Sequence, residues 1–324
     1  MPVKRILIGL VAIVASEIGM LLQVEPFWSW HTPIAWTGYI LLVDGVVHLR
    51  RGSSWLSDFP RQFAFLAVVS FPLWLVFEFY NLFIRNWHYV NLPESAFWRD
   101  VGYAWAFATI WPAIFETADL VASYRDGRRV GRPRPASAAV PIAPAATARP
   151  RRGSLGPSAS AGGRAAATAT TGTPLSRWGI VSIVIGAAML AWPLFWPSRY
   201  LAAPVWLGFI FLLDPLNARA GRQSLTADCR VHLPERDATM MAGRTDRAIN
   251  LMLAGLMCGF VWEFWNYWAR TKWIYTVPIL EHVKLFEMPL PGYLGFPAFA
   301  LECFTMYVSL RLLLGRGDGR PIAL

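Results

Sequence analysis

Charge is the scarcest property of this 324-residue sequence. Only 15% of its residues are Asp, Glu, Lys or Arg, whereas soluble domains average about 25%. Hydrophobic residues make up 55%, and the mean hydropathy is +0.39. This composition excludes a chain that is disordered throughout and argues against a soluble enzyme.

Cysteine and the common cofactor motifs are also scarce. The chain has three cysteines and no CxxC pair, which excludes a disulfide framework and a cysteine-based metal site. We expect all three to be reduced: Cys229, Cys258 and Cys303. The five histidines are scattered without HExxH spacing, and no P-loop, GxSxG or DDxxD motif occurs. We therefore predict no metal site and no cofactor.

Long apolar runs and aromatic residues are abundant. The sequence has 17 Trp, 20 Phe and 10 Tyr, and aromatic residues gather at membrane interfaces. A membrane-spanning helix needs about 20 apolar residues, or fewer where it is short or tilted. Eight segments approach this length: 6–24, 34–49, 63–84, 101–123, 178–196, 203–217, 248–269 and 293–313.

The basic residues predict how these segments are oriented. When the N-terminus is placed in the cytoplasm, the cytoplasmic parts of the chain are the two termini and every second connection between spans. Together they hold 24 of the 30 Lys and Arg. This asymmetry follows the positive-inside rule and predicts that both termini are cytoplasmic. We predict an inner-membrane protein that contacts membrane lipids. The net charge of +10 is then a topology signal, so no nucleic-acid partner is expected.

Residues 126–176 differ in composition from the rest of the chain. They consist of Ala, Arg, Pro, Ser, Thr and Gly with almost no aromatic residue. Such a segment cannot bury a core, which predicts a disordered cytoplasmic linker. It separates two predicted membrane units, residues 1–125 and 177–324.

The two units share five motifs in the same order, which indicates an internal duplication. The matches, first unit against second, are GYILLVD 38–44 with GFIFLLD 208–214, RRG 50–52 with RAG 219–221, FEFYN 77–81 with WEFWN 262–266, WHY 87–89 with WIY 273–275, and PA 112–113 with PA 297–298. Four spans in each unit give both units one orientation. We therefore predict an all-α fold of eight transmembrane helices, arranged as two parallel four-helix repeats.

Acidic residues inside the apolar segments are the candidate functional groups. One pattern spaces Glu, Asn and Arg at i, i+3 and i+7 and occurs twice, as Glu78, Asn81 and Arg85 and as Glu263, Asn266 and Arg270. This spacing puts the three side chains within about 60° of one helix face. An Asp at the centre of a membrane costs roughly 2.5–3.5 kcal/mol, so such acids face the bundle interior, pair, or stay protonated.

We interpret Glu263 and Glu78 as the acid and base, with Asn266 and Asn81 orienting them. Glu302 and Glu116 join them as candidate catalytic groups. The predicted substrate-binding residues are the remaining acids, the two arginines and the aromatic residues around Glu263: Asp214, Asp44, Arg270, Arg85, Trp262, Trp265, Trp273 and Tyr275. The alternative is structural, because Glu and Asn can simply join helices by hydrogen bonds.

The second unit resembles the membrane-integral isoprenoid cyclases, the lycopene and meroterpenoid cyclase families. Trp262-Glu263-Phe264 is similar to their aromatic-Glu-aromatic helix, and Trp273-Ile274-Tyr275 followed by Pro297 and Glu302 is similar to a later motif. It lacks the paired Glu-Glu that follows the proline in the lycopene type. The resemblance implies a helical bundle whose buried carboxylates protonate an apolar substrate without a cofactor.

Three functional classes follow from these observations. The leading prediction is a lipid- or isoprenoid-modifying enzyme that takes an apolar small molecule from the bilayer. The alternative is a transporter or channel whose intramembrane acids bind an ion or relay protons. A further alternative is a non-catalytic membrane scaffold that binds partners through the linker.

Overall fold

A computed structural model describes residues 2–127, 175–230 and 246–323 of the chain. Residues 2–127 are called the first half below, and the other two ranges the second half. The linker predicted at 126–176 lies, apart from its first two and last two residues, outside the described part. Cys258 and Cys303 are free and buried, as expected, and the side chain of Cys229 is outside the described part.

The first half consists of four long helices, two shorter ones and one strand. In chain order these are α1 (Pro2–Leu21), α2 (Phe27–Arg51), α3 (Trp55–Asp58), α4 (Pro60–Ile84), β1 (Trp87–Val90), α5 (Ala96–Ala108) and α6 (Ile110–Gly127).

The second half has a similar order of elements. These are α7 (Arg177–Phe195), the 3₁₀ helix η1 (Arg199–Leu201), α8 (Ala202–Arg219), α9 (Leu225–Arg230), α10 (Asp246–Trp268), β2 (Lys272–Tyr275), β3 (Lys284–Leu285), β4 (Met288–Pro289), the 3₁₀ helix η3 (Leu290–Leu294) and α11 (Gly295–Leu313). Strands β1 and β2 pair antiparallel, as do β3 and β4. The fold is thus mostly helical, and the all-α prediction missed these two small sheets.

Six helical segments of the described part are long and apolar enough to cross a membrane. They are Phe27–Arg51, Pro60–Ile84, Arg177–Phe195, Arg199–Arg219, Arg247–Trp268 and Leu290–Leu313. Helix α1 is not among them, because it includes Lys4, Arg5 and Glu17 within its 20 residues.

The predicted span at 101–123 is two helices rather than one. Helix α5 ends and α6 begins at Thr109, whose hydroxyl bonds back to the carbonyl of Ala106. The hydroxyl of Ser70 from α4 lies at this break, where it donates to the carbonyl of Phe107 and accepts from the N–H of Trp111. Pro112 in the first turn of α6 is a signal of a helix start, but the apolar run continues through it, so the sequence prediction took the two helices as one span.

Glycines allow the outer helices to approach their neighbours closely. A Cβ at Gly9 of α1 would lie 2.5 Å from the carbonyl oxygen of Gly38 in α2. A Cβ at Gly186 of α7 would lie 2.7 Å from the carbonyl oxygen of Gly208 in α8. Helices that meet through small residues gain close backbone packing, which is common inside membranes. Each half therefore begins with a tight pair of helices.

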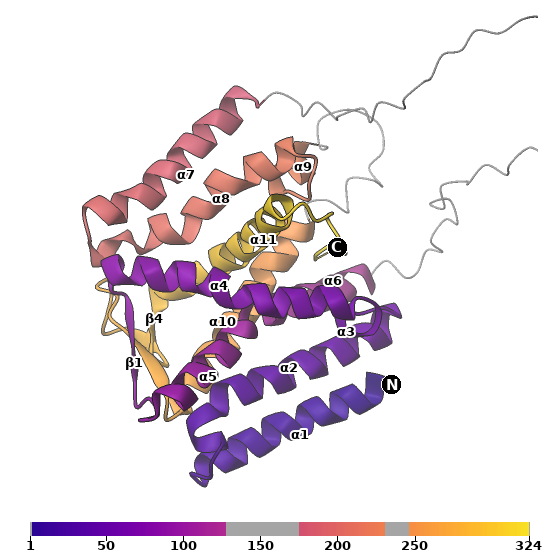
Figure 1. The fold of residues 1–324 in the computed structure, drawn as a ribbon, viewed down its shortest axis with the longest axis vertical. Helices are drawn as coiled ribbons and strands as arrows, with labels where there is room; N and C mark the ends of the chain where they lie inside the picture. The colour runs from indigo at the N-terminus through magenta and orange to yellow at the C-terminus, as the bar shows by residue number, and fades with distance from the viewer. Residues whose placement is uncertain (1, 128–174, 231–245, 324) are drawn as a thin grey trace, which may run out of the picture.

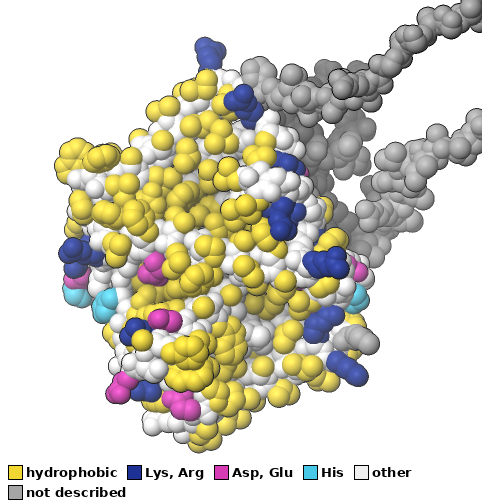
Figure 2. Space-filling model, in the orientation of Figure 1, with side chains coloured by type: hydrophobic (Ala, Val, Ile, Leu, Met, Phe, Trp, Pro, Cys, Tyr) yellow, Lys and Arg dark blue, Asp and Glu magenta, His cyan; other side chains and the backbone are white. Residues whose placement is uncertain are grey.

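The core lies between the inner helices, whereas the outer helices expose apolar side chains. Large side chains such as Trp55, Trp111 and Tyr307 are completely buried. In contrast, Trp178 and Phe195 of α7 are 81% and 73% exposed. Figure 2 shows hydrophobic side chains across the broad face between the two ends of the molecule. Lipid tails are the environment that suits such a face.

The helices run between two chemically different ends (Figure 1). One end holds both chain termini, α3 and α9 and is called the terminus end. The other holds β1, β2 and β4 and is called the strand end. In Figure 2, Lys and Arg line the terminus end, whereas basic and acidic side chains mix at the strand end.

Candidate functional site

A cavity of about 480 Å³ lies at the strand end and is lined by residues from both halves. Seven tryptophans form much of its wall: Trp30, Trp36, Trp74, Trp87, Trp206, Trp262 and Trp273. Pockets that bind small molecules typically measure about 300–1,000 Å³ and are mostly apolar. The size and lining of this cavity are therefore those of a small-molecule site.

The charged side chains that line this cavity are basic. They are Arg99, Arg199 and Lys272, and across the described ranges no Asp or Glu joins them in the lining. The ammonium of Lys272 is already paired, with its Nζ 2.6 Å from Oε1 of Glu287. The candidate acids Glu78 and Glu263 therefore lie behind the aromatic wall rather than in it.

Glu78 is held by three donors from that wall. Its Oε1 accepts from the indole Nε1 of Trp74 at 2.8 Å, from Nε1 of Trp87 at 3.2 Å and from the hydroxyl of Tyr89 at 2.5 Å. All three donors line the cavity. Hydrogen bonds of this kind stabilise negative charge on the oxygen that accepts them.

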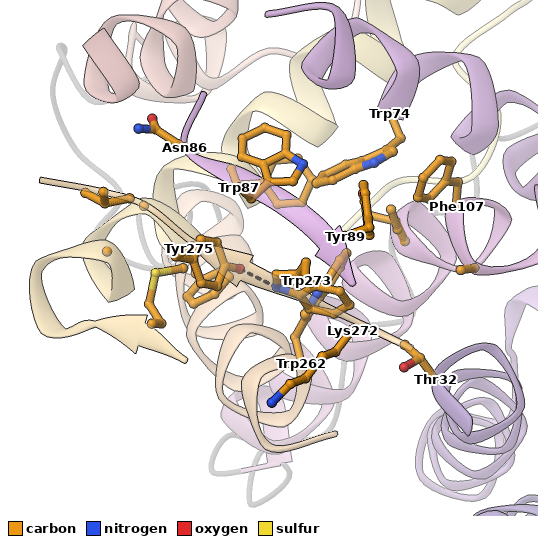
Figure 3. Close-up of a pocket in the computed structure, with 18 of the residues that line it drawn as sticks. Thr32, Trp74, Asn86, Trp87, Tyr89, Phe107, Trp262, Lys272, Trp273 and Tyr275 are labelled. Atoms are coloured by element: carbon orange, nitrogen blue, oxygen red, sulfur yellow. Dashed lines mark hydrogen bonds between the residues drawn. The ribbon is translucent and has the colours of Figure 1, made fainter. Parts of the chain in front are cut away.

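Glu263 has fewer partners and is completely buried. Its Oε1 accepts one hydrogen bond, from the hydroxyl of Tyr275 at 2.8 Å, and Oε2 has no partner in the described part of the chain. The same hydroxyl accepts from Nε1 of Trp273 at 2.8 Å, drawn as a dashed line in Figure 3. Trp273, Tyr275 and Glu263 thus form a chain that leads from the cavity wall to a buried carboxyl group.

Both phenols in these chains stay neutral. Burial raises the pKa of Tyr275 well above its usual value. Burial and the charge of Glu78 raise the pKa of Tyr89 in the same way. A phenol in such a setting keeps its proton unless it receives another at the same time.

Asn81 and Asn266 hold the backbone of the strands rather than the acids. Nδ2 of Asn81 donates to the carbonyl of Trp87, and Nδ2 of Asn266 donates to the carbonyl of Trp273, each at 2.8 Å. The side-chain oxygen of each accepts the N–H of the same tryptophan, at 3.3 Å and 2.9 Å respectively. The two asparagines therefore fix the strands that hold the donors to Glu78 and Glu263.

The pairing of β1 with β2 brings four aromatic side chains to one face. Trp87 lies opposite Tyr275, and Tyr89 lies opposite Trp273. Residues directly opposite each other, and residues two apart along a strand, point to the same side of a sheet. These four side chains therefore share one face, and all four line the cavity.

The other two candidate catalytic acids are buried away from the cavity lining. Glu302 is completely buried on α11, and its Oε1 accepts the backbone N–H of Phe209 in α8 at 3.1 Å. Glu116 is 1% exposed and interacts with the negative charges of Asp44 and Asp119. Within the described residues no hydrogen bond joins this pair of acids to Glu78 or Glu263.

Asp44 and Asp214 bind backbone at the terminus end. Asp44 accepts the N–H of Leu56 at 2.9 Å, and its other oxygen pairs with Arg5. Asp214 accepts the N–H groups of Leu225 and Thr226 at 2.8 Å. Each aspartate thereby satisfies free N–H groups at the start of a short helix, α3 or α9. Neither lines the cavity.

The remaining predicted binding residues divide between the cavity and its surroundings. Trp262, Trp273 and Tyr275 line the cavity. Trp265 instead donates its Nε1 to Glu17 at 2.8 Å. The two predicted arginines are not in the lining either: Arg85 caps α4 with φ of 49°, and Arg270 lies 3.7 Å from Glu25.

Sequence reasoning missed several residues of this site. Trp87 and Tyr89 lie in the repeated WHY motif, and that repetition was the available signal. Trp36 and Trp206 each lie two residues before the repeated segments 38–44 and 208–214. The offset of 170 residues that aligns these segments also aligns the two tryptophans. Trp74 has no such signal, because the matching position in the second half is Gly259.

Within residues 2–127, 175–230 and 246–323, no group of three or more His, Cys, Asp or Glu side chains could hold a metal ion. No protein-family model matches this chain, and neither a curated protein nor a solved structure matches it.

Proposed function

We propose that the protein is a membrane enzyme that modifies an apolar, lipid- or isoprenoid-like molecule by acid–base chemistry. One observation supports this most. An aromatic cavity of ligand size is walled by two phenols, Tyr275 and Tyr89, and each donates a hydrogen bond to a carboxyl group behind it. This arrangement places proton donors and acceptors beside a mostly apolar cavity.

In this proposal Glu263 is the acid. It is buried with one oxygen unpartnered by the described residues, an environment that favours the neutral, protonated carboxyl group. When Glu263 is protonated, the hydrogen bond between the two groups reverses: the carboxyl O–H donates to the phenol oxygen of Tyr275, and the phenol proton turns toward the cavity. Tyr275 passes this proton to the substrate while its oxygen takes the proton of Glu263. This transfer is concerted because the raised pKa of Tyr275 prevents the free phenolate.

Glu78 is the base and the fixed negative charge. Protonation of a substrate double bond or epoxide leaves a carbocation, which the tryptophan faces stabilise by cation–π attraction, worth about 2 kcal/mol or more without water. Loss of a proton from the rearranged cation to Glu78, through Tyr89, completes the reaction. The net change is a rearrangement of the substrate, which gains one proton from Glu263 and loses one to Glu78. Between turnovers Glu78 releases its proton to water and Glu263 takes one up from water, which restores the enzyme, and no oxidant or reductant is needed.

The proposal includes the arrangement in the membrane. We place eight spans as two parallel repeats in an inner membrane, with the terminus end in the cytoplasm. Two features support the repeat: Asn81 and Asn266 make the same pair of hydrogen bonds, and the matching WHY and WIY segments pair antiparallel about His88 and Ile274. A twofold axis along the membrane normal produces both features.

The test is mass spectrometry of the lipids that co-purify with the wild-type protein and with Glu263→Gln in mild detergent. We expect a specific apolar or isoprenoid molecule to accumulate on the variant, because binding persists when turnover stops. Loss of a general acid typically lowers a rate by about 10²–10⁴-fold.

A matched control separates the acid from general damage. Glu281→Gln changes an exposed carboxylate beside His282, in the connection between β2 and β3, that has no part in the proposed proton path. We expect this control to carry the same lipids as wild type. Only bulk phospholipid on both the wild type and Glu263→Gln would refute the enzyme proposal.

A proton-coupled transporter is the second candidate. Glu302 and Glu116 favour it, because both are buried beyond the cavity and each has at least one oxygen without a partner among the described residues. Such acids can relay protons along a path between the two ends. Proton-dependent uptake of a solute into proteoliposomes, lost in Glu302→Gln, would favour transport over catalysis.

A further inference from the structure

Residues 276–294, called the hairpin segment below, connect β2 to α11 and form part of the cavity wall. In the first half the matching position, between the repeated WHY and PA motifs, holds helix α5, which also lines the cavity. The second half instead has β3, β4 and η3 there, with prolines at 278, 289 and 291. Proline lacks the N–H group that a helix interior needs. The duplicated units therefore wall one cavity with a regular helix on one side and an irregular hairpin on the other.

The hairpin segment is only loosely embedded in the fold. Of residues 276–294, all of which the structure describes, only Met288 and Pro289 are buried. The side chains of Leu280, Leu290 and Leu294 are 59%, 48% and 76% exposed. A segment with few buried contacts opens at a lower free energy than the packed core does. Its exposed leucines suit contact with lipid, as do the apolar side chains of the outer helices.

Two side-chain contacts hold the hairpin against the helices. Nζ of Lys272 on β2 lies 2.6 Å from Oε1 of Glu287, and the two side chains are only 20% and 17% exposed. The ring of the adjacent Phe286 packs against the rings of Phe264 and Tyr267 on α10, with both pairs of centroids 5.8 Å apart. Phe286 has φ of 58°, and a residue with a side chain keeps this conformation only where its surroundings hold it. The turn of the hairpin is therefore fastened from outside.

The ion pair is connected directly to the cavity wall. Lys272 lines the cavity from β2 (Figure 3). Met288, the residue after Glu287, lines it from the hairpin segment and is 6% exposed. The turn at Gly292 covers Met288 so closely that a Cβ at Gly292 would collide with its Sδ. Movement of Glu287 away from Lys272 therefore withdraws Met288 from the cavity.

We propose that the hairpin segment is a lid over the cavity and that the Lys272–Glu287 ion pair is its latch. When the latch breaks, the hairpin moves away from β2 and α10, and a molecule from the bilayer enters the cavity beside Met288. Loops that close over a site in this way commonly control the entry of substrate and the release of product. The inference rests on the proposed function only in taking the cavity as the substrate site. It adds that access to this site is controlled from the second half.

The experiment measures how fast methyl methanethiosulfonate, a small neutral thiol reagent, labels a cysteine behind the lid. The reporters are Met288→Cys on the hairpin segment and Ile110→Cys on α6. The native side chains line the cavity and are 6% and 3% exposed. Peptide mass spectrometry of the full-length protein in detergent reads each position separately from the native cysteines. We expect slow labelling of both reporters, and we expect Glu287→Gln to accelerate both about fivefold, because the charge that strengthens the latch is lost.

Further variants distinguish the latch from local damage. Lys272→Gln removes the other charge, and we expect the same acceleration. In the double variant, Lys272→Gln with Glu287→Gln, we expect no further acceleration, because the effects of two residues that act through one interaction do not add. Glu281→Gln makes the same charge change at an exposed position of the hairpin segment, and we expect the wild-type labelling rate.

The outcomes separate the lid from the proposed function. An unchanged labelling rate of either reporter in Glu287→Gln, or fast labelling of both without that change, would overturn the lid. The two reporters lie on different elements, so the test remains decisive if one of them prevents folding. Labelling needs neither a ligand nor turnover. The lid can therefore fail while Glu263→Gln still accumulates a specific lipid, and the enzyme proposal can fail while the latch still controls labelling.

Discussion

Glu78 and Glu263 occupy matching positions in two copies of one sequence motif, yet their carboxyl groups have different surroundings. Glu78 accepts three hydrogen bonds on one oxygen. Glu263 accepts one, and its other oxygen is buried without a partner from the described residues. Part of the difference arises one turn earlier on each helix, where Trp74 precedes Glu78 but Gly259 precedes Glu263.

This difference shows that two matching motifs need not have the same function. Three donors hold negative charge on Glu78 in place, which suits a fixed anion or a base. Glu263 has one hydrogen-bond donor and a second oxygen that accepts no hydrogen bond from the described residues. These surroundings favour the protonated carboxyl group, which suits an acid. A duplicated carboxylate pair can become an acid and a base through changes in the residues around it, without changing either carboxylate.

The largest expected effect is the loss of stability when the asparagines that hold the strands are replaced. Asn81→Ala removes three hydrogen bonds, since its oxygen also accepts the N–H of Asn86, and Asn266→Ala removes two. At about 1 kcal/mol for each bond, we expect losses of about 3 and 2 kcal/mol in the free energy of unfolding. Denaturant titrations in detergent, followed by near-ultraviolet circular dichroism, measure both. Equal losses would show that the two halves are held alike.

The second prediction compares the two carboxyl groups directly. Glu78→Gln loses the charge that strengthens three hydrogen bonds, and we expect it to lower the unfolding free energy by about 2 kcal/mol. Glu263→Gln keeps its one accepted bond, and we expect a change within about 0.5 kcal/mol. The same titrations report both values. A larger loss for Glu263→Gln would contradict the assignment of the fixed charge to Glu78.

The smallest effect concerns the two phenols. Tyr275→Phe removes the hydroxyl between Glu263 and the cavity. A water molecule in its place can still pass the proton, so we expect the kcat to fall about tenfold, equivalent to about 1.4 kcal/mol. Tyr89→Phe leaves Glu78 with two donors, and we expect about a twofold fall. Initial rates on the lipid found to accumulate on Glu263→Gln provide the measurement. A greater fall for Tyr89→Phe would reverse the proposed roles of acid and base.

Much of the helical architecture could be predicted from the sequence. Each of the eight apolar segments corresponds to helical structure, because an apolar run long enough to cross a bilayer must satisfy its backbone hydrogen bonds within itself. The break at Thr109 and the strands could not be predicted in this way. Ser70 stabilises the break from a different helix, and β1 needs β2, which lies more than 180 residues away, as its partner.

The candidate site was predictable in part. The Glu-x-x-Asn spacing is enough to single out Glu78 and Glu263, because charge inside an apolar segment is costly and needs a reason. The same spacing could not reveal that Asn266 binds the backbone of Trp273 rather than Glu263. It also could not identify Trp30, which lies on α2 and packs against Gly102 of α5.

The sequence by itself determined the helices, their apolar surfaces and the paired motifs, since these depend on residue type and on spacing along one segment. Only the tertiary structure decided which side chains surround each carboxyl group. That decision depends on the register of β1 with β2 and on how α2, α4, α5 and α10 pack. Hydrogen bonds act over about 3 Å, so the environment of a buried acid depends on neighbours that are distant in the chain and unmarked in its sequence.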